Sequence, residues 1–237
     1  MRSRLILEEG QREKFKNDVQ QIRDLFFERI EPIFADAENE AETYTEKLNE
    51  EVGESINWGG DNAPDPEDAE EAVWDAGVER YKLLSTMRNR TLVMWISCMC
   101  QVWEQQLHSF ILHEALMEGI TYDEKFKGSG FKFIQDVLMW HDIKIKKFKS
   151  WKYIYEMRLL VNAVKHGPGD SEKKLRAIRP DFFNNHGFDV MKFRSSTLLE
   201  DTLQVHNDDF DNYYKAIIDF WNEFPEEAYS DAEFIES

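Results

Sequence analysis

Apolar residues recur at steps of three and four along most of this chain, which is the spacing of one face of an α-helix. Pro32 interrupts the first such stripe, because its ring removes an amide donor and crowds the preceding turn. We therefore predict either one kinked helix or two successive helices before Val52. The stripe comprises Phe15, Val19, Ile22, Phe26, Ile30, Ile33, Ala37, Ala41, Tyr44 and Leu48.

A second helical pattern runs from about Glu67 to Met117, with Gly77 and Asn89 as its weakest points. Its second half is apolar nearly all round, which indicates a core helix buried on more than one side. We expect this helix to end at Gly119, since glycine is common just beyond a helix C-terminus. The core stripe consists of Leu92, Ile96, Met99, Trp103, Leu107 and Phe110.

Two shorter helices are predicted in the next part of the chain. The first lies around Phe131–Trp140. The second begins in or just after the lysine-rich run that ends at Lys152, and it carries an apolar face of its own. Gly167 supplies a turn conformation and Pro168 blocks continuation, so this helix should end with His166 in its last turn.

The remainder of the chain holds one short and one longer helix. Asp170 or Ser171 is expected to cap the short helix, which stops before Pro180. The longer helix is amphipathic and starts near Asp208. Helices thus account for most of the chain.

These elements define a fold class and a domain organisation. Two brief extended pieces near residues 190–205 can pair as a small hairpin, so the sequence predicts an all-α helical bundle with long N-terminal helices and at most this one hairpin. A Gly-, Pro- and Asp-rich stretch before residue 66 marks a boundary. We predict an acidic helical extension and loop over residues 1–65, a helical domain over 66–225 and an acidic flexible tail over 226–237.

Composition narrows the class further. Hydrophobic residues make up 42% of the 237 residues and aromatic residues 14%, enough to build a packed core. No apolar run approaches the roughly 18 residues that a membrane helix needs, and the first residues lack the apolar core of a signal peptide, so we expect a cytoplasmic protein with no membrane partner. Cys98 and Cys100 lie two apart on a helix and point to different sides. We read them as packing residues and expect no metal and no other cofactor.

Charge is distributed unevenly along the chain. The net charge of −18 by itself argues against a nucleic-acid partner. However, residues 36–79 hold 16 Asp and Glu against one Lys, a balance of −15, whereas residues 125–179 hold 14 Lys and Arg against five acids, a balance of +9. The chain therefore contains a basic block in which an anion can bind.

One row of polar residues lies inside this basic block. Arg158, Asn162 and His166 are spaced four residues apart, which places them along one face of a helix. A guanidinium can hold phosphate oxygens, and an imidazole can transfer a proton near neutral pH. RNA supplies its own nucleophile, the 2′-hydroxyl, so such a site needs neither a metal nor a protein nucleophile.

The segment NAVKHG at residues 162–167, preceded by a core helix with Trp103 and Glu104 in its middle, resembles the HEPN superfamily. These are small α-helical domains that usually pair as homodimers and include many metal-independent RNases of toxin–antitoxin and antiphage systems. The family motif is Arg, a polar residue, three further residues and His, in which the His serves in cleavage and the Arg holds the phosphate. Asn162 and His166 match this motif, but Val161 occupies the Arg position.

The resemblance implies a homodimeric endoribonuclease of toxin or defence type that cleaves RNA through its 2′-hydroxyl, with two His166 side chains in one cleft. An antitoxin or another regulatory protein is then a further expected partner. We assign His166 as general acid and base, Arg158 as phosphate clamp in place of Val161, and Asn162 as the residue that orients one of them. The supporting residues are Glu104, beside a basic side chain, and the RNA contacts Lys147, Lys149, Lys152 and Lys165.

Two other interpretations stay open. A non-catalytic HEPN-like module that binds a nucleotide, an RNA or a protein partner is favoured by Val161 in the Arg position. A helical scaffold that binds a basic protein through its acidic N-terminal helices is the other. In either case the polar row of Arg158, Asn162 and His166 can serve only to hydrogen-bond neighbouring helices.

Overall fold

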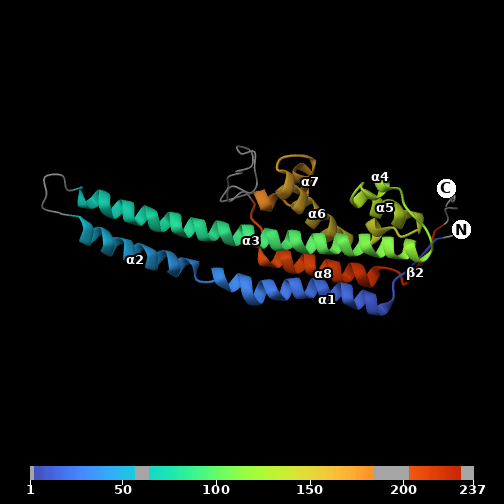
Figure 1. The fold of residues 1–237 in the computed structure, drawn as a ribbon. Coiled ribbons are helices and arrows are strands. Elements are labelled where there is room, and N and C mark those ends of the chain that lie inside the picture. The colour runs from blue at the N-terminus through green and yellow to red at the C-terminus, as the bar shows by residue number, and fades with distance from the viewer. Residues whose placement is uncertain (1–2, 57–63, 184–202, 231–237) are drawn as a thin grey trace. The chain divides into compact units, whose positions relative to one another are not determined.

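The protein is all-α in class, as predicted, with one small antiparallel sheet in the described part of the chain (Figure 1). The computed structural model describes residues 3–56, 64–183 and 203–230. None of the helices found there is both long enough and apolar enough to cross a lipid bilayer. The α-helices are α1 (Glu9–Leu25), α2 (Ala37–Ser55), α3 (Pro66–Met117), α4 (Glu124–Lys127), α5 (Phe131–Trp140), α6 (Trp151–His166), α7 (Asp170–Ile178) and α8 (Asn207–Glu223).

Helix boundaries follow the sequence signals. α1 gives way to a π-helical turn over Phe26–Ile30 and a 3₁₀ turn over Glu31–Phe34 that contains Pro32, so of the two predicted alternatives the structure shows two successive helices. Gly119 and Gly167, at the ends of α3 and α6, both adopt positive φ angles, which glycine tolerates without steric cost. α3 itself continues without interruption through both of its predicted weak points.

The small sheet joins segments from far apart in the chain. β1 (Arg4–Ile6) pairs antiparallel with β2 (Glu227–Tyr229), and the buried Leu5 faces Ala228. The hairpin predicted near residues 190–205 falls mainly outside the described residues, and residues 203–206 form no strand. Strand β2 also shows that the segment expected to be a flexible tail is paired at its start.

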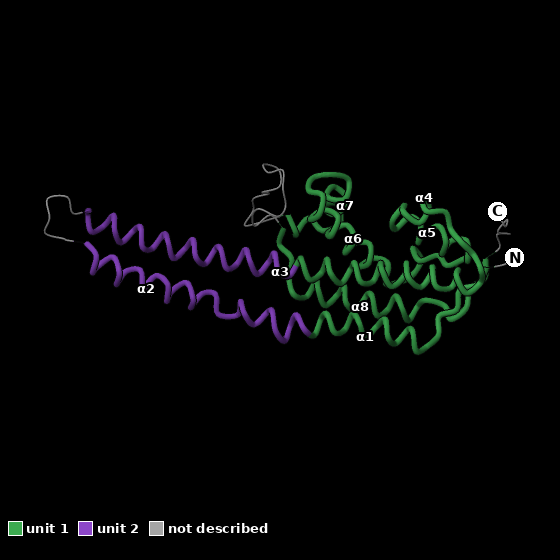
Figure 2. The backbone as a smooth tube through the Cα atoms, in the orientation of Figure 1, with its two compact units in different colours: residues 1–24, 93–237 green, residues 25–92 purple. Residues whose placement is uncertain are grey.

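The chain forms two compact units (Figure 2). Unit 1 comprises residues 1–24 and 93–237, and unit 2 comprises residues 25–92. This division differs from the boundary predicted near residue 65, because the first 24 residues pack with the C-terminal part of the chain. In the sequence, the stretch that suggested a boundary lies between α2 and the first part of α3, which both belong to unit 2.

The core of unit 1 is built around aromatic side chains from α1, α3 and α8. Trp103 of α3 and Trp221 of α8 are fully buried and both contact Phe220, while Phe15 of α1 packs on Trp221 with ring centres 4.6 Å apart. Gln106 supplies the polar contacts between these helices: its amide donates to the Phe15 carbonyl at 3.0 Å and accepts from the Trp221 indole at 3.2 Å. This satisfied amide fixes the three helices relative to one another.

Charged side chains close the C-terminal end of α8. The guanidinium of Arg12, which is buried, donates to the carbonyls of Trp221 and Phe224, the second at 2.9 Å. The carboxylate of Glu223 accepts the backbone amides of Lys149 and Ser150 at 2.7 and 3.0 Å. Because these amides lie just before α6, Glu223 caps α6 and attaches its N-terminus to α8.

Unit 2 consists of α2, the first part of α3 and the turns that precede α2. Its two helices run side by side (Figure 2), and they approach so closely at Gly77 that a β-carbon there would collide with Thr45. Ion pairs of Arg80 with Glu40 and of Arg88 with Glu31 connect the helices to each other and to the turn before α2. Few apolar side chains of this unit are buried, since two helices share only one contact face.

The buried His141 makes unit 1 sensitive to acid. Its ring is 2% exposed, with Nδ1 2.8 Å from the Val137 carbonyl oxygen and Nε2 3.1 Å from the Ser3 hydroxyl. A carbonyl can only accept, so Nδ1 carries the proton and Nε2 of the neutral ring accepts from Ser3. Burial lowers the pKa of His141. As the pH falls, this histidine is therefore protonated in the unfolded chain before it is protonated in the folded chain.

We therefore expect the free energy of unfolding to fall as the pH drops from about 7 to about 5.5, through the ordinary titration range of histidine. Urea unfolding at a series of pH values measures this, and His141→Gln should flatten the dependence. The exposed His113 is the matched control, as His113→Gln should leave the slope unchanged. Equal slopes in the wild type and His141→Gln would contradict the assignment.

Candidate functional site

α6 carries the predicted polar row, and its orientation is set by packing. Ile154, Met157, Leu160 and Ala163 are fully buried on its inner side. The opposite side leaves Tyr155, Lys165 and His166 exposed, with Trp151, Arg158 and Asn162 half-buried. We call these six residues, together with the exposed Lys152, the α6 stripe.

Arg158, Asn162 and His166 lie along one side of α6, as predicted from their spacing, but their side chains do not meet at one site. His166 is exposed, and Asn162 is half-buried beside it on the same helix. Arg158 lies eight residues before His166, which corresponds to about 12 Å along a helix axis. The predicted catalytic pair of Arg158 and His166 is therefore not brought together within one chain.

Arg158 is engaged with two other residues. Its Nε donates to Oε1 of Glu104 on α3 at 2.6 Å, and its guanidinium carbon lies 3.5 Å from the ring centre of Phe131 on α5. Glu104 thus neutralises a basic side chain of α6, in the position expected for it. Val161, in the Arg position of the family motif, is 8% exposed and belongs to the core.

The four predicted RNA-contacting lysines remain available. Lys147, Lys149, Lys152 and Lys165 are exposed, and none pairs with a carboxylate of the described residues. Most acids of the basic block are already neutralised within it. The internal pairs are Lys132 with Asp136, Lys144 with Asp142, Arg176 with Glu172 and Arg179 with Glu156.

Sequence reasoning missed a series of stacked rings at the start of the α6 stripe. Tyr155 stacks on Trp151 with ring centres 6.5 Å apart and an angle of 26° between their planes, and Trp151 stacks on Phe131 at 6.3 Å and 20°. Phe131 in turn lies against Arg158. Tyr155 ends the series and is 36% exposed. The four-residue spacing of Trp151 and Tyr155 is the signal that could have revealed it.

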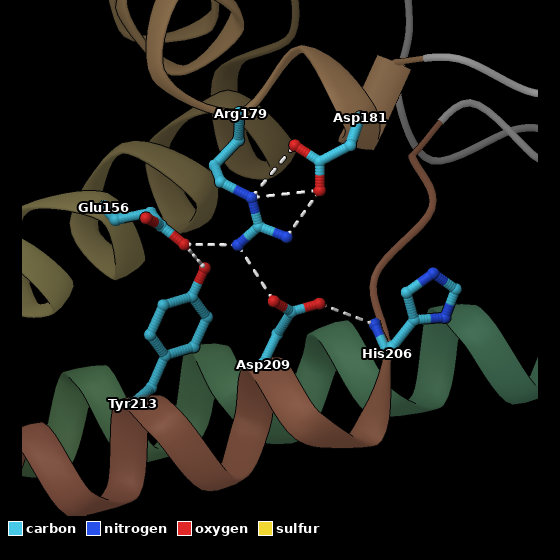
Figure 3. A network of polar contacts seen from close by, with 6 residues as sticks. All are labelled: Glu156, Arg179, Asp181, His206, Asp209 and Tyr213. Carbon is cyan, nitrogen blue, oxygen red and sulfur yellow. Dashed lines mark hydrogen bonds and ion pairs between the residues drawn. The ribbon is translucent and has the colours of Figure 1, made fainter.

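A second polar cluster, also missed, lies beside α6 and is centred on Arg179 (Figure 3). Its Nη1 contacts Oε1 of Glu156 at 2.5 Å and Oδ1 of Asp209 at 2.8 Å, while its Nη2 donates to Asp181 at 2.6 Å. The phenol of Tyr213 donates to the same Glu156 oxygen at 2.9 Å. We call Glu156, Arg179, Asp181, Asp209 and Tyr213 the Arg179 cluster.

The Arg179 cluster is a structural connection between helices. Burial opposes the charge of Arg179, but hydrogen bonds to three carboxylates raise its pKa. Burial and the adjacent Glu156 carboxylate raise the pKa of the Tyr213 hydroxyl, which stays a donor. Asp209 also accepts the His206 amide at 2.9 Å, so the cluster closes the start of α8. In the sequence, Glu156 stands between Tyr155 and Met157, and a carboxylate among apolar residues indicates a buried ion pair.

No family model matches the chain, and searches of curated proteins and of solved structures likewise find no match. Within the described residues, no group of three or more His, Cys, Asp or Glu side chains is placed to hold a metal ion.

Removal of Arg179 should destabilise unit 1 far more than removal of Arg158. Arg179→Met leaves the buried carboxylates of Glu156 and Asp209 without a cation, a loss of about 3 kcal/mol or more. Arg158→Met removes a pair whose Glu104 partner is still in contact with water, at a cost of about 1 kcal/mol or less. Urea unfolding of both variants at pH 7 provides the comparison. Equal losses would mean that the Arg179 cluster does not hold the helices together.

Proposed function

We propose that unit 1 is a HEPN-like module that binds single-stranded RNA along the α6 stripe and does not cleave it. The observation that carries this proposal is that one side of α6 combines a stacked aromatic series with lysines that pair with no carboxylate of the described residues. The resemblance at residues 162–167 agrees with an RNA ligand. Cleavage by an Arg158–His166 pair is disfavoured by the engagement of Arg158.

Charge supports an anionic ligand at this surface. Lys149 and Lys152 flank the start of α6, and Lys165 and His166 lie at its end. The 16 residues of α6 span about 24 Å at the rise of an α-helix. A short stretch of extended nucleic-acid backbone can therefore contact cations at both ends of the helix, and its affinity should fall steeply with salt.

Aromatic stacking supports a single strand over a duplex. An unpaired base can continue the series of Phe131, Trp151 and Tyr155 by stacking on the last ring. Each such base contributes roughly 1–3 kcal/mol in single-strand binding proteins. The bases of a duplex are already stacked on one another and offer no free face along the helix.

A second candidate function, metal-independent RNA cleavage of toxin or defence type, is favoured by one observation. His166 is exposed, and its imidazole ring makes no hydrogen bond or ion pair with a described residue. In a homodimer, a second copy could supply the cation that Arg158 does not provide. An antitoxin or other regulatory partner belongs to this candidate.

The stacking role of Tyr155 can be tested against a matched tyrosine on the same helix. Tyr153 is 37% exposed and lies on the other side of α6, outside the stacked series; its ring contacts the Lys152 ammonium at 5.1 Å, a contact whose loss leaves the lysine charge in place. We expect Tyr155→Ala to weaken binding of an unstructured fluorescein-labelled RNA about tenfold, since one base loses its stacking partner, and Tyr153→Ala to change it less than about twofold. Fluorescence anisotropy titrations at two salt concentrations give the affinities.

Two further arms complete this titration. A duplex of the same sequence should bind the wild type more weakly than the single strand. Glu104→Gln should strengthen RNA binding several-fold, because it removes a negative charge and releases Arg158. Absence of RNA binding at low salt would reject the proposed function, whereas equal effects of the two tyrosine substitutions would reject the stacking alone.

Cleavage is decided separately. The wild type, incubated with RNA in EDTA, should bind it without producing 2′,3′-cyclic phosphate ends. The control is His166→Ala, shown by circular dichroism to be folded. If the wild type produces such ends and His166→Ala does not, the second candidate replaces the proposed one.

A further inference from the structure

Unit 2 contains a groove of 540 Å³ between α2 and α3. None of the residues that line it belongs to the α6 stripe. Its floor is formed by Ala41, Thr45, Gly77 and Val78. The close approach of the helices at Gly77 lowers this floor, since any larger residue there would collide with Thr45. The groove is therefore a consequence of how the two helices pack.

The walls of the groove are aromatic on one side. Trp74 and Tyr81, seven residues apart on α3, stand along it and are 65% and 47% exposed. Single exposed apolar side chains are common, but exposed aromatic side chains that line one groove together form the kind of patch that binds another molecule. Trp and Tyr are also the residues that most often dominate the binding energy of protein interfaces.

The other side of the groove is acidic. Glu38, Glu42 and Glu46 are spaced four residues apart, so they form one row along α2, and all three are exposed. None of them pairs with a Lys or Arg of the described residues, in contrast to Glu40, which pairs with Arg80. These three carboxylates lie beside an apolar floor. A ligand that combines positive charge with an apolar face therefore complements the groove.

We infer that this groove binds an amphipathic helix rich in Lys or Arg from a partner protein. The apolar face of such a helix fits between Trp74 and Tyr81, and its cations pair with the Glu38–Glu46 row. This row spans about 12 Å, the length of roughly two helical turns, which sets the size of the contact. The balance of −15 over residues 36–79 attracts a basic partner and repels nucleic acid.

The test uses the full chain and a fluorescein-labelled synthetic peptide of Leu and Lys in a helical amphipathic pattern, about four turns long. Trp74→Ala should weaken peptide binding about tenfold or more, as expected for a central aromatic contact. The matched control is Met94→Ala, because Met94 is also 65% exposed on α3 but lies in unit 1. That variant should bind the peptide like the wild type.

A second pair of variants separates the groove from general charge. Glu38→Gln, Glu42→Gln and Glu46→Gln together should weaken binding several-fold and reduce its salt dependence. Glu51→Gln, Glu54→Gln and Glu79→Gln together remove the same charge from exposed positions outside the groove, and they should have much less effect. Equal effects of the two triple variants, or full affinity in Trp74→Ala, would overturn the inference.

Sedimentation velocity of the wild type and Trp74→Ala tests whether a second copy of this chain occupies the groove instead. The inference predicts that the two proteins sediment alike. A dimer that is lost in Trp74→Ala would show that a second copy of this chain covers the groove, and it would overturn the assignment to a basic partner.

Discussion

α6 is held by charges that α8 contributes at two separate places. Glu223, near the end of α8, caps the N-terminus of α6, and Asp209, near the start of α8, binds Arg179, which in turn binds Glu156 of α6. Rotation of α6 about its own axis would break both connections. Together with the packing of its apolar side, this pair of attachments determines which side of α6 meets solvent, and with it the α6 stripe.

The same constraint explains why the predicted catalytic row is incomplete. With α6 fixed in this orientation, Arg158 meets Glu104 and Phe131, whereas His166 extends into solvent two turns further on. Of the three members of the row, Arg158 has become part of the packing, Asn162 is half-buried, and no contact with a described residue engages the ring of His166. What the α6 stripe presents to solvent is the ring of Tyr155 and the side chains of Lys152, Lys165 and His166.

Sequence alone accounted for most of the helices, because their boundaries are set locally. Pro32, Gly119 and Gly167 act on the backbone within one turn of their own position. The partners of Arg158 and Arg179 could not be predicted in this way. Helical spacing gives the face on which a side chain lies but not its rotamer, and Glu104 and Glu156 lie 54 and 23 residues from the arginines that they bind. The division into units was missed for a related reason, since no local signal shows that α1 packs against α8.

In the sequence, the residues of unit 1 come partly before and partly after those of unit 2, and this order has a consequence for synthesis of the chain. Unit 2 is a continuous stretch, so all of its residues have left the ribosome before most of unit 1 has been made. By contrast, α1 is made early, yet its partners Trp221 and Phe224 arrive about 200 residues later, since Arg12 and Trp221 are 209 residues apart. Phe15 can meet α3 once Gln106 has been made, but Trp221, on which its ring packs, is made much later, so closure of the unit 1 core is a late, long-range step. During that interval the apolar residues of α1 lack their α8 partners, and transiently exposed apolar surface of this kind makes a nascent chain prone to aggregation.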